Sequence, residues 1–373
     1  MNINIFFEFL RFSLDKEKTW NKKISENEWN EIYQMSYRQA LVGVVYGGVK
    51  KLSKEFAPPF ALALQWAAQA EKIRGMNIIF NSEAKRLTEI FSMENRKNVI
   101  LKGQANARFY PDKFSRQPGD IDIYIEGGKE SVVELIGKLG MLPKDLPESA
   151  LKAYHHVHLP ENENGISVEV HFRPSSGFFN SFYNNRLQEV LEENLKDLEL
   201  TSDGFYSPSM RFAFLMQLAH LQRHFFMEGV GLRQITDYYF LLKNSTKEDR
   251  EYVKGLLKRL NMHRFAEALM WILKQIFSLD EEFMICPSDE NLGKKVMNDI
   301  IQGGNFGWYN RKKDDPWGKF FYNRKRNFKL LGINPWEILP NEMKYWKAFL
   351  KNMPKRIRYK TLSLETIKKD EEN

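Results

Sequence analysis

Residues 119–125 read GDIDIYI, and this alternation of polar and apolar residues is typical of a β-strand with one face in a hydrophobic core. Successive side chains of a strand point to opposite faces, so Asp120 and Asp122 project together while the isoleucines project into the core. Two carboxylates on one face repel each other unless a cation lies between them. Mg²⁺ is the natural candidate, since it favours one or two carboxylates together with substrate phosphates. Two solvated acids on an edge strand would give the same pattern.

A second alternating stretch, SVEVHFR at residues 167–173, offers a third carboxylate. Its apolar residues alternate with Glu169, His171 and Arg173, which therefore share the other face. Three acids from two neighbouring strands can hold two metal ions about 3.5–4 Å apart, which is the arrangement used in phosphoryl or nucleotidyl transfer. The two stretches together therefore favour an active metal site over an isolated pair of surface acids.

Apolar runs and helical periods elsewhere predict an α+β fold. We expect strands at residues 99–101, 121–125, 155–159 and 166–172, the last two forming an antiparallel hairpin, and a helix at 131–139. Helical spacing marks residues 29–49, 76–91, 212–226, 235–243, 251–260 and 265–277. The chain is therefore divided into an N-terminal helical region (1–95), an α+β unit (96–205), a second helical region (206–302) and a C-terminal segment (303–373).

Composition excludes several classes of protein. The chain has 373 residues, of which 43% are hydrophobic and 28% charged, as in globular proteins. Cys286 is the single cysteine, so an internal disulfide and a cysteine-rich zinc site are excluded and a cytoplasmic location is expected. The N-terminus carries Glu8 and Arg11 and does not read as a signal peptide. The longest uncharged stretch, residues 56–70, is shorter than the roughly 20 residues a spanning helix needs.

The net charge of +8 comes from the C-terminal segment. Residues 311–360 contain 15 Lys or Arg against 4 Asp or Glu, whereas residues 1–310 contain 39 against 40. Tryptophan and tyrosine interleave with these basic residues, a composition that suits nucleic acid, an anionic membrane surface or another polyanion. The alternative is a helical cap whose aromatic rings pack on the protein body while the charges stay solvated. We favour the cap, because no recognised nucleic-acid module accompanies the charge.

Several short motifs occur in a fixed order along the chain. They are LKG (101–103), YPD (110–112), Arg116, GDID (119–122), VEVH (168–171), His220, RH (223–224) and GVGLRQITD (229–237). This set resembles a largely uncharacterised bacterial nucleotidyltransferase family within the DNA polymerase β-like superfamily. The resemblance covers roughly residues 20–270. Superfamily members generally carry Gly-Ser near the start of the palm, where this chain has Lys102-Gly103.

The resemblance implies a small polymerase-β-like palm, a mixed sheet with helices, embedded between mainly helical regions. It implies that three catalytic residues bind metal: Asp120, Asp122 and Glu169. The metal would be two Mg²⁺ ions, with Mn²⁺ as a possible substitute. Glu169 would also help to deprotonate the acceptor. The nucleotide-binding residues would be Lys102, Gly103, Arg116 and Gly119. Possible contacts to acceptor or phosphates are His171, Arg173, His220, Arg223, His224 and Arg233. Arg116 could equally be a solvated loop residue.

Two spacings of four residues carry further expectations. His220 and His224 share one face of a predicted helix, where interior packing, contact with substrate and metal binding all stay open. Arg233 and Asp237 have the same spacing, which predicts an intrahelical ion pair. Strand alternation sends His156 and His158 of the predicted hairpin to one face, where they could line the cleft. We favour the alternative that residues 155, 156 and 158 are half-exposed strand residues.

The predicted activity is Mg²⁺-dependent transfer of a nucleoside monophosphate from a nucleoside triphosphate to an acceptor, with release of pyrophosphate. The acceptor could be a small molecule, a peptide or protein, or an RNA. Two alternatives remain: a nucleic-acid-binding protein with a degenerate palm, and a metal-dependent phosphohydrolase that uses the same acids on another scaffold.

Overall fold

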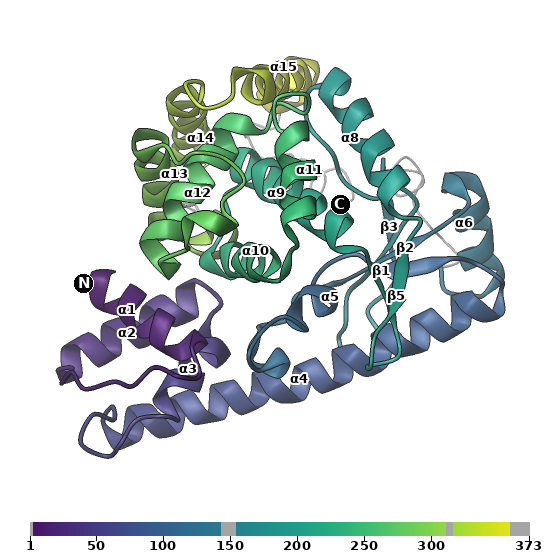
Figure 1. Ribbon diagram of the computed structural model, residues 1–373. Coiled ribbons are helices and arrows are strands. Elements are labelled where there is room, and N and C mark those ends of the chain that lie inside the picture. Colours follow the sequence, from purple (N-terminus) through teal and green to yellow (C-terminus); the bar gives the residue numbers. More distant parts are fainter. Residues whose placement is uncertain (1–2, 143–153, 311–315, 359–373) are drawn as a thin grey trace.

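The computed structural model describes residues 3–142, 154–310 and 316–358, and it confirms the predicted α+β class. A small mixed sheet lies among many helices, with the long helix α4 running along one side of the molecule (Figure 1). Within the described chain, no helix combines the length and the apolar character that a membrane crossing requires.

The N-terminal region contains α1 (Ile3–Leu14), α2 (Glu26–Arg38), α3 (Val42–Val49) and α4 (Phe60–Met93). Ser25 caps α2 in a capping box with Glu28. The helical period of residues 29–49 is interrupted between α2 and α3, where Ala40 has a φ of 56°. Helix α4 begins at Phe60, directly after Pro58 and Pro59. A proline breaks a helix that precedes it, so the two prolines separate α4 from the helices before it.

The main sheet has the order β1-β2-β4-β3, built from β1 (Asn98–Ile100), β2 (Ile121–Ile125), β4 (Val168–His171) and β3 (His156–His158). Strands β2 and β4 are parallel, while β1 and β3 run antiparallel to their neighbours, so the predicted hairpin of β3 and β4 is confirmed. The isoleucines of β2 pack in one core with α4 and with α6 (Gly128–Lys138). The polar side chains of the strands therefore turn to the opposite face of the sheet.

The helices after the sheet are α8 (Ser181–Asn194), α9 (Met210–Met227), α10 (Leu232–Asn244), α11 (Lys247–Leu256), α12 (His263–Phe277) and α13 (Glu290–Gly303). The sequence pattern predicted α9 to α12 but missed α8 and the short hairpin of β5 (Leu198–Leu200) and β6 (Tyr206–Pro208). Residues of α9, α10 and α12 share a single hydrophobic core with α1, α2 and α3. The helices that precede the sheet in the sequence and those that follow it therefore pack against each other.

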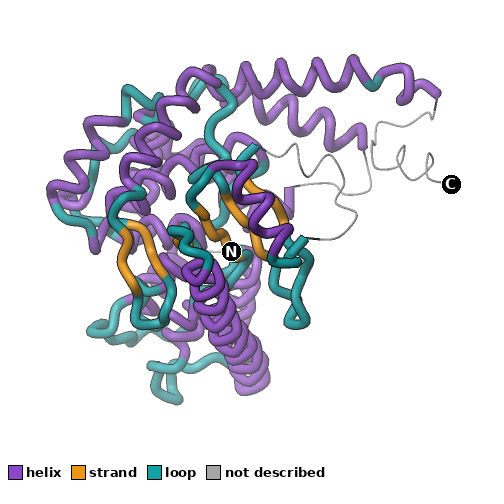
Figure 2. Tube along the Cα trace, turned by 90° about the vertical axis from the view of Figure 1, so that its right-hand side faces the viewer, coloured by secondary structure: helices purple, strands orange, loops and turns teal. Residues whose placement is uncertain are grey.

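The C-terminal segment forms α14 (Pro316–Leu330), α15 (Pro335–Lys351) and α16 (Met353–Arg358), and Figure 2 shows part of it extending away from the body. Leu330, Ile333 and Ile338 are buried in the main core, as a cap requires. The expectation that the aromatic rings also pack on the body is wrong for Trp317 and Phe321, which are 57% and 62% exposed. Of the basic segment 311–360, residues 311–315 and 359–360 lie outside the described chain.

Candidate active site

The register of three strands places the predicted acids in one row. Asp122 on β2 is paired with Glu169 on β4, and Glu169 is paired with His158 on β3. Two residues further along β4, His171 is paired with His156 on β3. Because these side chains project from one face of the sheet, the acids and histidines form a continuous cluster. Asp122 is fully buried, whereas the side chain of Glu169 is partly accessible.

Lys102 lies between the two aspartates of the Asp-x-Asp motif. Its Nζ is 3.0 Å from Oδ2 of Asp122 and 3.8 Å from Oδ1 of Asp120. Burial alone would lower the pKa of Lys102, but the negative charges of Asp122 and Asp120 outweigh burial and raise the pKa above its usual range. The ammonium group therefore holds the position between the carboxylates where the sequence predicts a cation. Gly103, next in the chain, adopts a φ of 64° before the short helix α5 (Gln104–Ala107).

His171 provides a second positive charge to the same carboxylates. Its Nε2 is 3.1 Å from Oδ1 of Asp122 and 3.3 Å from Oε2 of Glu169. Burial disfavours the charged imidazole, but the two hydrogen bonds outweigh burial and raise the pKa of His171 to about 9. Burial would raise the pKa of Glu169, yet the hydrogen bond from His171 and nearby positive charges lower that pKa to about 2. Both partners are therefore charged at neutral pH.

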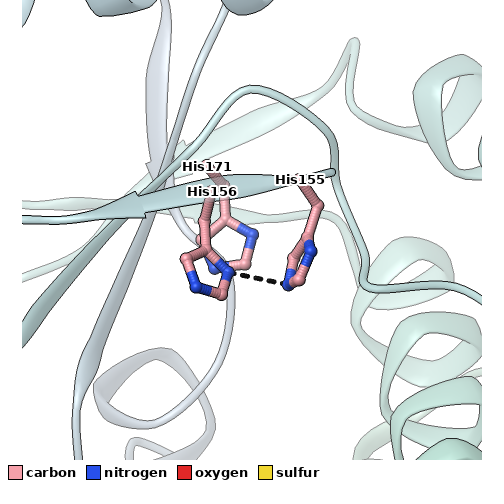
Figure 3. A group of neighbouring side chains, drawn as sticks. All are labelled: His155, His156 and His171. Carbon is pink, nitrogen blue, oxygen red and sulfur yellow. Dashed lines mark hydrogen bonds between the residues drawn. The ribbon is translucent and has the colours of Figure 1, made fainter. Parts of the chain in front are cut away.

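His156 and His158 on β3, with His155 directly before this strand, continue the cluster away from Asp122. Nε2 of His155 lies 2.7 Å from Nδ1 of His156, whose Nε2 lies 3.0 Å from Nε2 of His158 (Figure 3 shows the first of these contacts). Burial, helped by the neighbouring imidazoles, lowers the pKa of His155 to about 2 and of His156 to about 4. The sequence predicted that His156 and His158 share one face, but it missed the cluster that the three histidines form with Glu169 and His171.

A second cluster of buried charge joins the loop before β2 to α10. Nε and Nη2 of Arg116 donate to the two oxygens of Asp237 at 2.7 and 2.8 Å, and the hydroxyl of Tyr110 donates to Asp237 at 2.7 Å. Arg116 is only 5% exposed, so the alternative of a solvated loop residue is wrong. The predicted ion pair of Arg233 with Asp237 is also wrong: Arg116 is the ionic partner, and Arg233 donates to the carbonyl of Gln117 at 2.9 Å.

A small pocket lies between these two clusters. Its lining includes seven of the predicted site residues: Lys102, Gly103, Arg116, Gly119, Asp120, His220 and Arg233. Its free volume of about 20 Å³ is enough for a water molecule only. A side chain at Gly119 would place its Cβ 3.3 Å from Nη1 of Arg233, so the glycine permits this close approach. Burial, followed by repulsion from Arg116, lowers the pKa of Arg233 to about 10, which leaves the guanidinium charged at neutral pH.

The remaining predicted contacts point elsewhere. Nη1 of Arg173 donates to the hydroxyl of Tyr154, the guanidinium of Arg223 lies 3.3 Å from the ring centre of Phe179, and Nδ1 of His224 is 2.7 Å from Glu228. The rings of His220 and His224 are 4.1 Å apart, so their predicted common face is confirmed. The sequence reasoning missed four residues that line the pocket or hold it together: Tyr110, Gln217, Gln234 and Phe306.

This fold and this site define a class of protein, in which a small palm-like sheet gathers carboxylates beside basic residues suited to phosphate chemistry. The family described as uncharacterised nucleotidyltransferases matches residues 25–278, and the chain belongs to that family. The match confirms the expected likeness to an uncharacterised nucleotidyltransferase family and supports a transferase. A search of curated proteins finds no match to this chain.

Proposed function

We propose that the protein is a metal-dependent nucleotidyltransferase that moves a nucleoside monophosphate from a nucleoside triphosphate to an acceptor. An acceptor oxygen forms a bond to the α-phosphorus, the bond from that phosphorus to the β-phosphate oxygen breaks, and pyrophosphate leaves. The observation that carries this proposal is the pairing of Asp122 with Glu169 across parallel strands. Asp120 lies near the same ammonium group, that of Lys102, as Asp122 does. Membership of the nucleotidyltransferase family supports it independently.

The residues fit a magnesium site. Asp120, Asp122 and Glu169 offer the carboxylate oxygens that Mg²⁺ prefers, with Mn²⁺ as a possible substitute. Asp120 has a side chain that is 41% exposed, so the site is open to solvent on one side. The position of Lys102 between the aspartates indicates that their combined charge attracts a cation. When bound, Mg²⁺ would neutralise charge on the phosphates and orient them for displacement.

Lys102 and Arg233 are the cations that we assign to the phosphates. With a metal ion held by the aspartates, the ammonium of Lys102 would leave its place between them and bind the phosphates instead. Arg233 is charged and borders the same pocket as Asp120, and its Nε has no hydrogen-bond partner among the described residues. The guanidinium of Arg116, by contrast, is occupied by Asp237, so we assign Arg116 the role of holding the loop that leads to Gly119 and Asp120.

Glu169 is better suited to hold metal than to take a proton. With a pKa of about 2, its carboxylate is a weak base at neutral pH. We therefore propose Glu169 as a ligand that completes the metal site. Proton removal from the acceptor would then fall to solvent or to the acceptor's own surroundings.

The nucleotide must lie mostly outside the small pocket. Since the pocket holds about 20 Å³, a triphosphate can reach Asp120 only from the solvent side or after a lining residue moves. Phe306 is one of these lining residues, and it lies at the kink of the segment Asn305–Asn310 with a φ of 53°. The acceptor stays open among a small molecule, a peptide or protein, and RNA. The single cysteine, Cys286, is consistent with action in a reducing compartment such as the cytoplasm.

The test is the thermal stability of the purified chain with ATP, GTP, CTP or UTP, each with and without Mg²⁺. A ligand that binds only the native state raises the unfolding temperature by mass action. We expect a Mg²⁺-dependent rise with at least one nucleotide, lost in the Asp120→Asn/Asp122→Asn variant and kept in Asp280→Asn, a change at an exposed acid on the helical side. A rise that persists in the double variant would contradict the carboxylate site. In turnover, free phosphate in place of pyrophosphate would favour a phosphohydrolase.

One surface favours nucleic-acid binding as a second candidate function. Trp346 and Met343 are exposed on α15 together with Lys344 and Lys347, which suits stacking on bases beside phosphate contacts. RNA binding that weakens with added salt and survives Asp120→Asn/Asp122→Asn would support this candidate. Absence of such binding would leave the α15 surface without a role in nucleic-acid recognition.

A further inference from the structure

Four of the seven histidines of the chain lie together on β3, directly before β3 and on β4, and one of them, His171, also contacts the carboxylates of Asp122 and Glu169. They are His155, His156, His158 and His171. Antiparallel pairing sets His156 opposite His171, and the bend before β3 turns the ring of His155 toward both (Figure 3). The ring centres of His155 and His156 lie 5.3 and 5.1 Å from that of His171. Three imidazoles, from β4, from β3 and from the residue before β3, therefore lie side by side.

The distances fit a shared ion. One ring nitrogen from each of His155, His156 and His171 lies within 4.8 Å of the other two. Zinc binds imidazole nitrogens at about 2.0–2.1 Å, so tetrahedral ligand atoms are about 3.3 Å apart, and small side-chain rotations would reach that arrangement. His155 Nε2 and His156 Nδ1 already face each other at 2.7 Å.

The surroundings orient one of these rings in the way that metal-binding histidines require. Nδ1 of His171 lies 3.3 Å from the carbonyl oxygen of Arg173, so its Nε2, which contacts Asp122 and Glu169, is the ring nitrogen left for an ion. A backbone carbonyl on one ring nitrogen directs the other nitrogen toward the ion and fixes the tautomer. Oε2 of Glu169, 3.4 Å from Nδ1 of His156, is available as a fourth ligand.

We propose that His155, His156 and His171 form a binding site for one divalent transition-metal ion, with Zn²⁺ as the representative. The ion takes the place of the proton on Nε2 of His171, which is released to solvent on binding. Imidazole nitrogen suits Zn²⁺, Co²⁺ and Ni²⁺, whereas Mg²⁺ prefers oxygen, so this site and the aspartate site select different ions. The site needs no nucleotide and stands whether or not the chain transfers nucleoside monophosphates.

The experiment uses the full chain, freed of metal, without nucleotide. Co²⁺ is titrated and followed by visible absorption, and Zn²⁺ affinity is measured by calorimetry. We expect one ion per chain and an intense absorption band typical of four-coordinate Co²⁺. The His155→Asn/His156→Asn variant should lose at least about 100-fold in Zn²⁺ affinity, since even changes to residues that only orient ligands cost about 10–100-fold. The control His263→Asn, at the start of α12, should bind like the parent chain.

Two outcomes would overturn the proposal: absence of stoichiometric Zn²⁺ binding to the parent chain, or equal affinity in the double variant and the parent. Circular dichroism checks that each variant is folded, and the single change His155→Gln serves if the double variant does not fold. Asp120→Asn separates the two metal sites, because it removes a ligand of the proposed magnesium site and none of the three imidazoles. Loss of nucleotidyl transfer would therefore leave the Zn²⁺ result unaffected.

Discussion

Two clusters of buried charge border the same small pocket, and they differ in how fully their carboxylates are occupied. In the loop–helix cluster, formed by Tyr110, Arg116 and Asp237, one carboxylate receives three hydrogen bonds of 2.7–2.8 Å. In the strand cluster, formed by Asp120, Asp122 and Glu169 with Lys102 and His171, three carboxylates share two cations at 3.0–3.8 Å. The first cluster has no place for another ion, whereas the second has more negative than positive groups.

This difference separates a structural clamp from a candidate site for a ligand. An arginine fork matched to one carboxylate has a single favourable geometry, so the loop–helix cluster holds the loop before β2 against α10. A lysine can move between several acceptors, because its ammonium is a point charge on a flexible stem. The excess of carboxylates and the movable lysine together favour exchange of Lys102 for a metal ion.

The largest expected effect comes from breaking the clamp. Asp237→Asn leaves Arg116 buried without its negative partner, and such a loss typically costs about 3–5 kcal/mol of unfolding free energy. Urea denaturation of the variant measures it, with Asp280→Asn as a surface control expected to change stability by less than about 0.5 kcal/mol. A cost for Asp237→Asn below about 1 kcal/mol would show that the clamp acts like a surface ion pair.

The matching change in the strand cluster should affect activity more than stability. In Asp122→Asn, Lys102 keeps Asp120 and His171 keeps Glu169, so no buried cation loses all its partners. We expect a smaller loss of unfolding free energy than in Asp237→Asn and a fall of about 10²–10³-fold in nucleotidyl transfer, the scale of removing one electrostatic group from an active site. Pyrophosphate release and urea denaturation measure the two effects. If Asp122→Asn were active but strongly destabilised, Asp122 would be a structural residue and not a metal ligand.

A buried carboxylate outside both clusters extends the comparison, because no arginine within the described ranges donates a pair of hydrogen bonds to it. Glu337 on α15 accepts the backbone N–H of Phe179 at 2.9 Å, and burial raises its pKa from 4.5 to about 7. A raised pKa favours the protonated acid in the folded chain, so its contribution to stability is complete below pH 4.5 and is lost as the pH rises through 7. The loss amounts to at most about 3 kcal/mol, from 1.36 kcal/mol per pKa unit.

Glu337→Gln tests this dependence, since glutamine keeps an acceptor for Phe179 and cannot ionise. Unfolding free energies of the parent and the variant are compared at pH 4.5 and pH 8. We expect the parent to lose more stability than the variant over this interval. Parallel pH profiles would contradict the assignment of the effect to Glu337.

The smallest expected effect removes one hydroxyl from the clamp. Tyr110→Phe deletes a hydrogen bond to a charged acceptor, which is worth about 1.5–3 kcal/mol. Tyr238→Phe is the matched control, because Tyr238 is also fully buried and its hydroxyl has no hydrogen-bond partner among the described residues. Thermal and urea unfolding should show a loss for Tyr110→Phe and little or no loss for Tyr238→Phe. Equal losses would mean that the hydroxyl of Tyr110 contributes nothing specific.

Local periodicity was enough to predict the carboxylates of the strand cluster, but it predicted neither the places of Lys102 and His171 between them nor the clamp. The alternation in residues 119–125 and 167–173 encodes which side chains share a face, so β2, β4 and the meeting of Asp122 with Glu169 followed from a period of two. The partner of Asp237 did not follow, because two arginines of suitable charge were available and only the packing of α10 against the loop before β2 selects Arg116. Phe306 was missed for a related reason, since its place at the pocket depends on tertiary structure alone.

The parallel pairing of β2 and β4 also has a consequence for how the chain folds. Parallel neighbours cannot be joined by a tight turn, so the connection from β2 passes through α6 and β3 before β4 can take its place. The entropy of closing this connection must be lost before Asp122 and Glu169 can meet, and such distant pairings slow folding. We therefore expect the two acids to come together late on the folding pathway, after the local helices have formed.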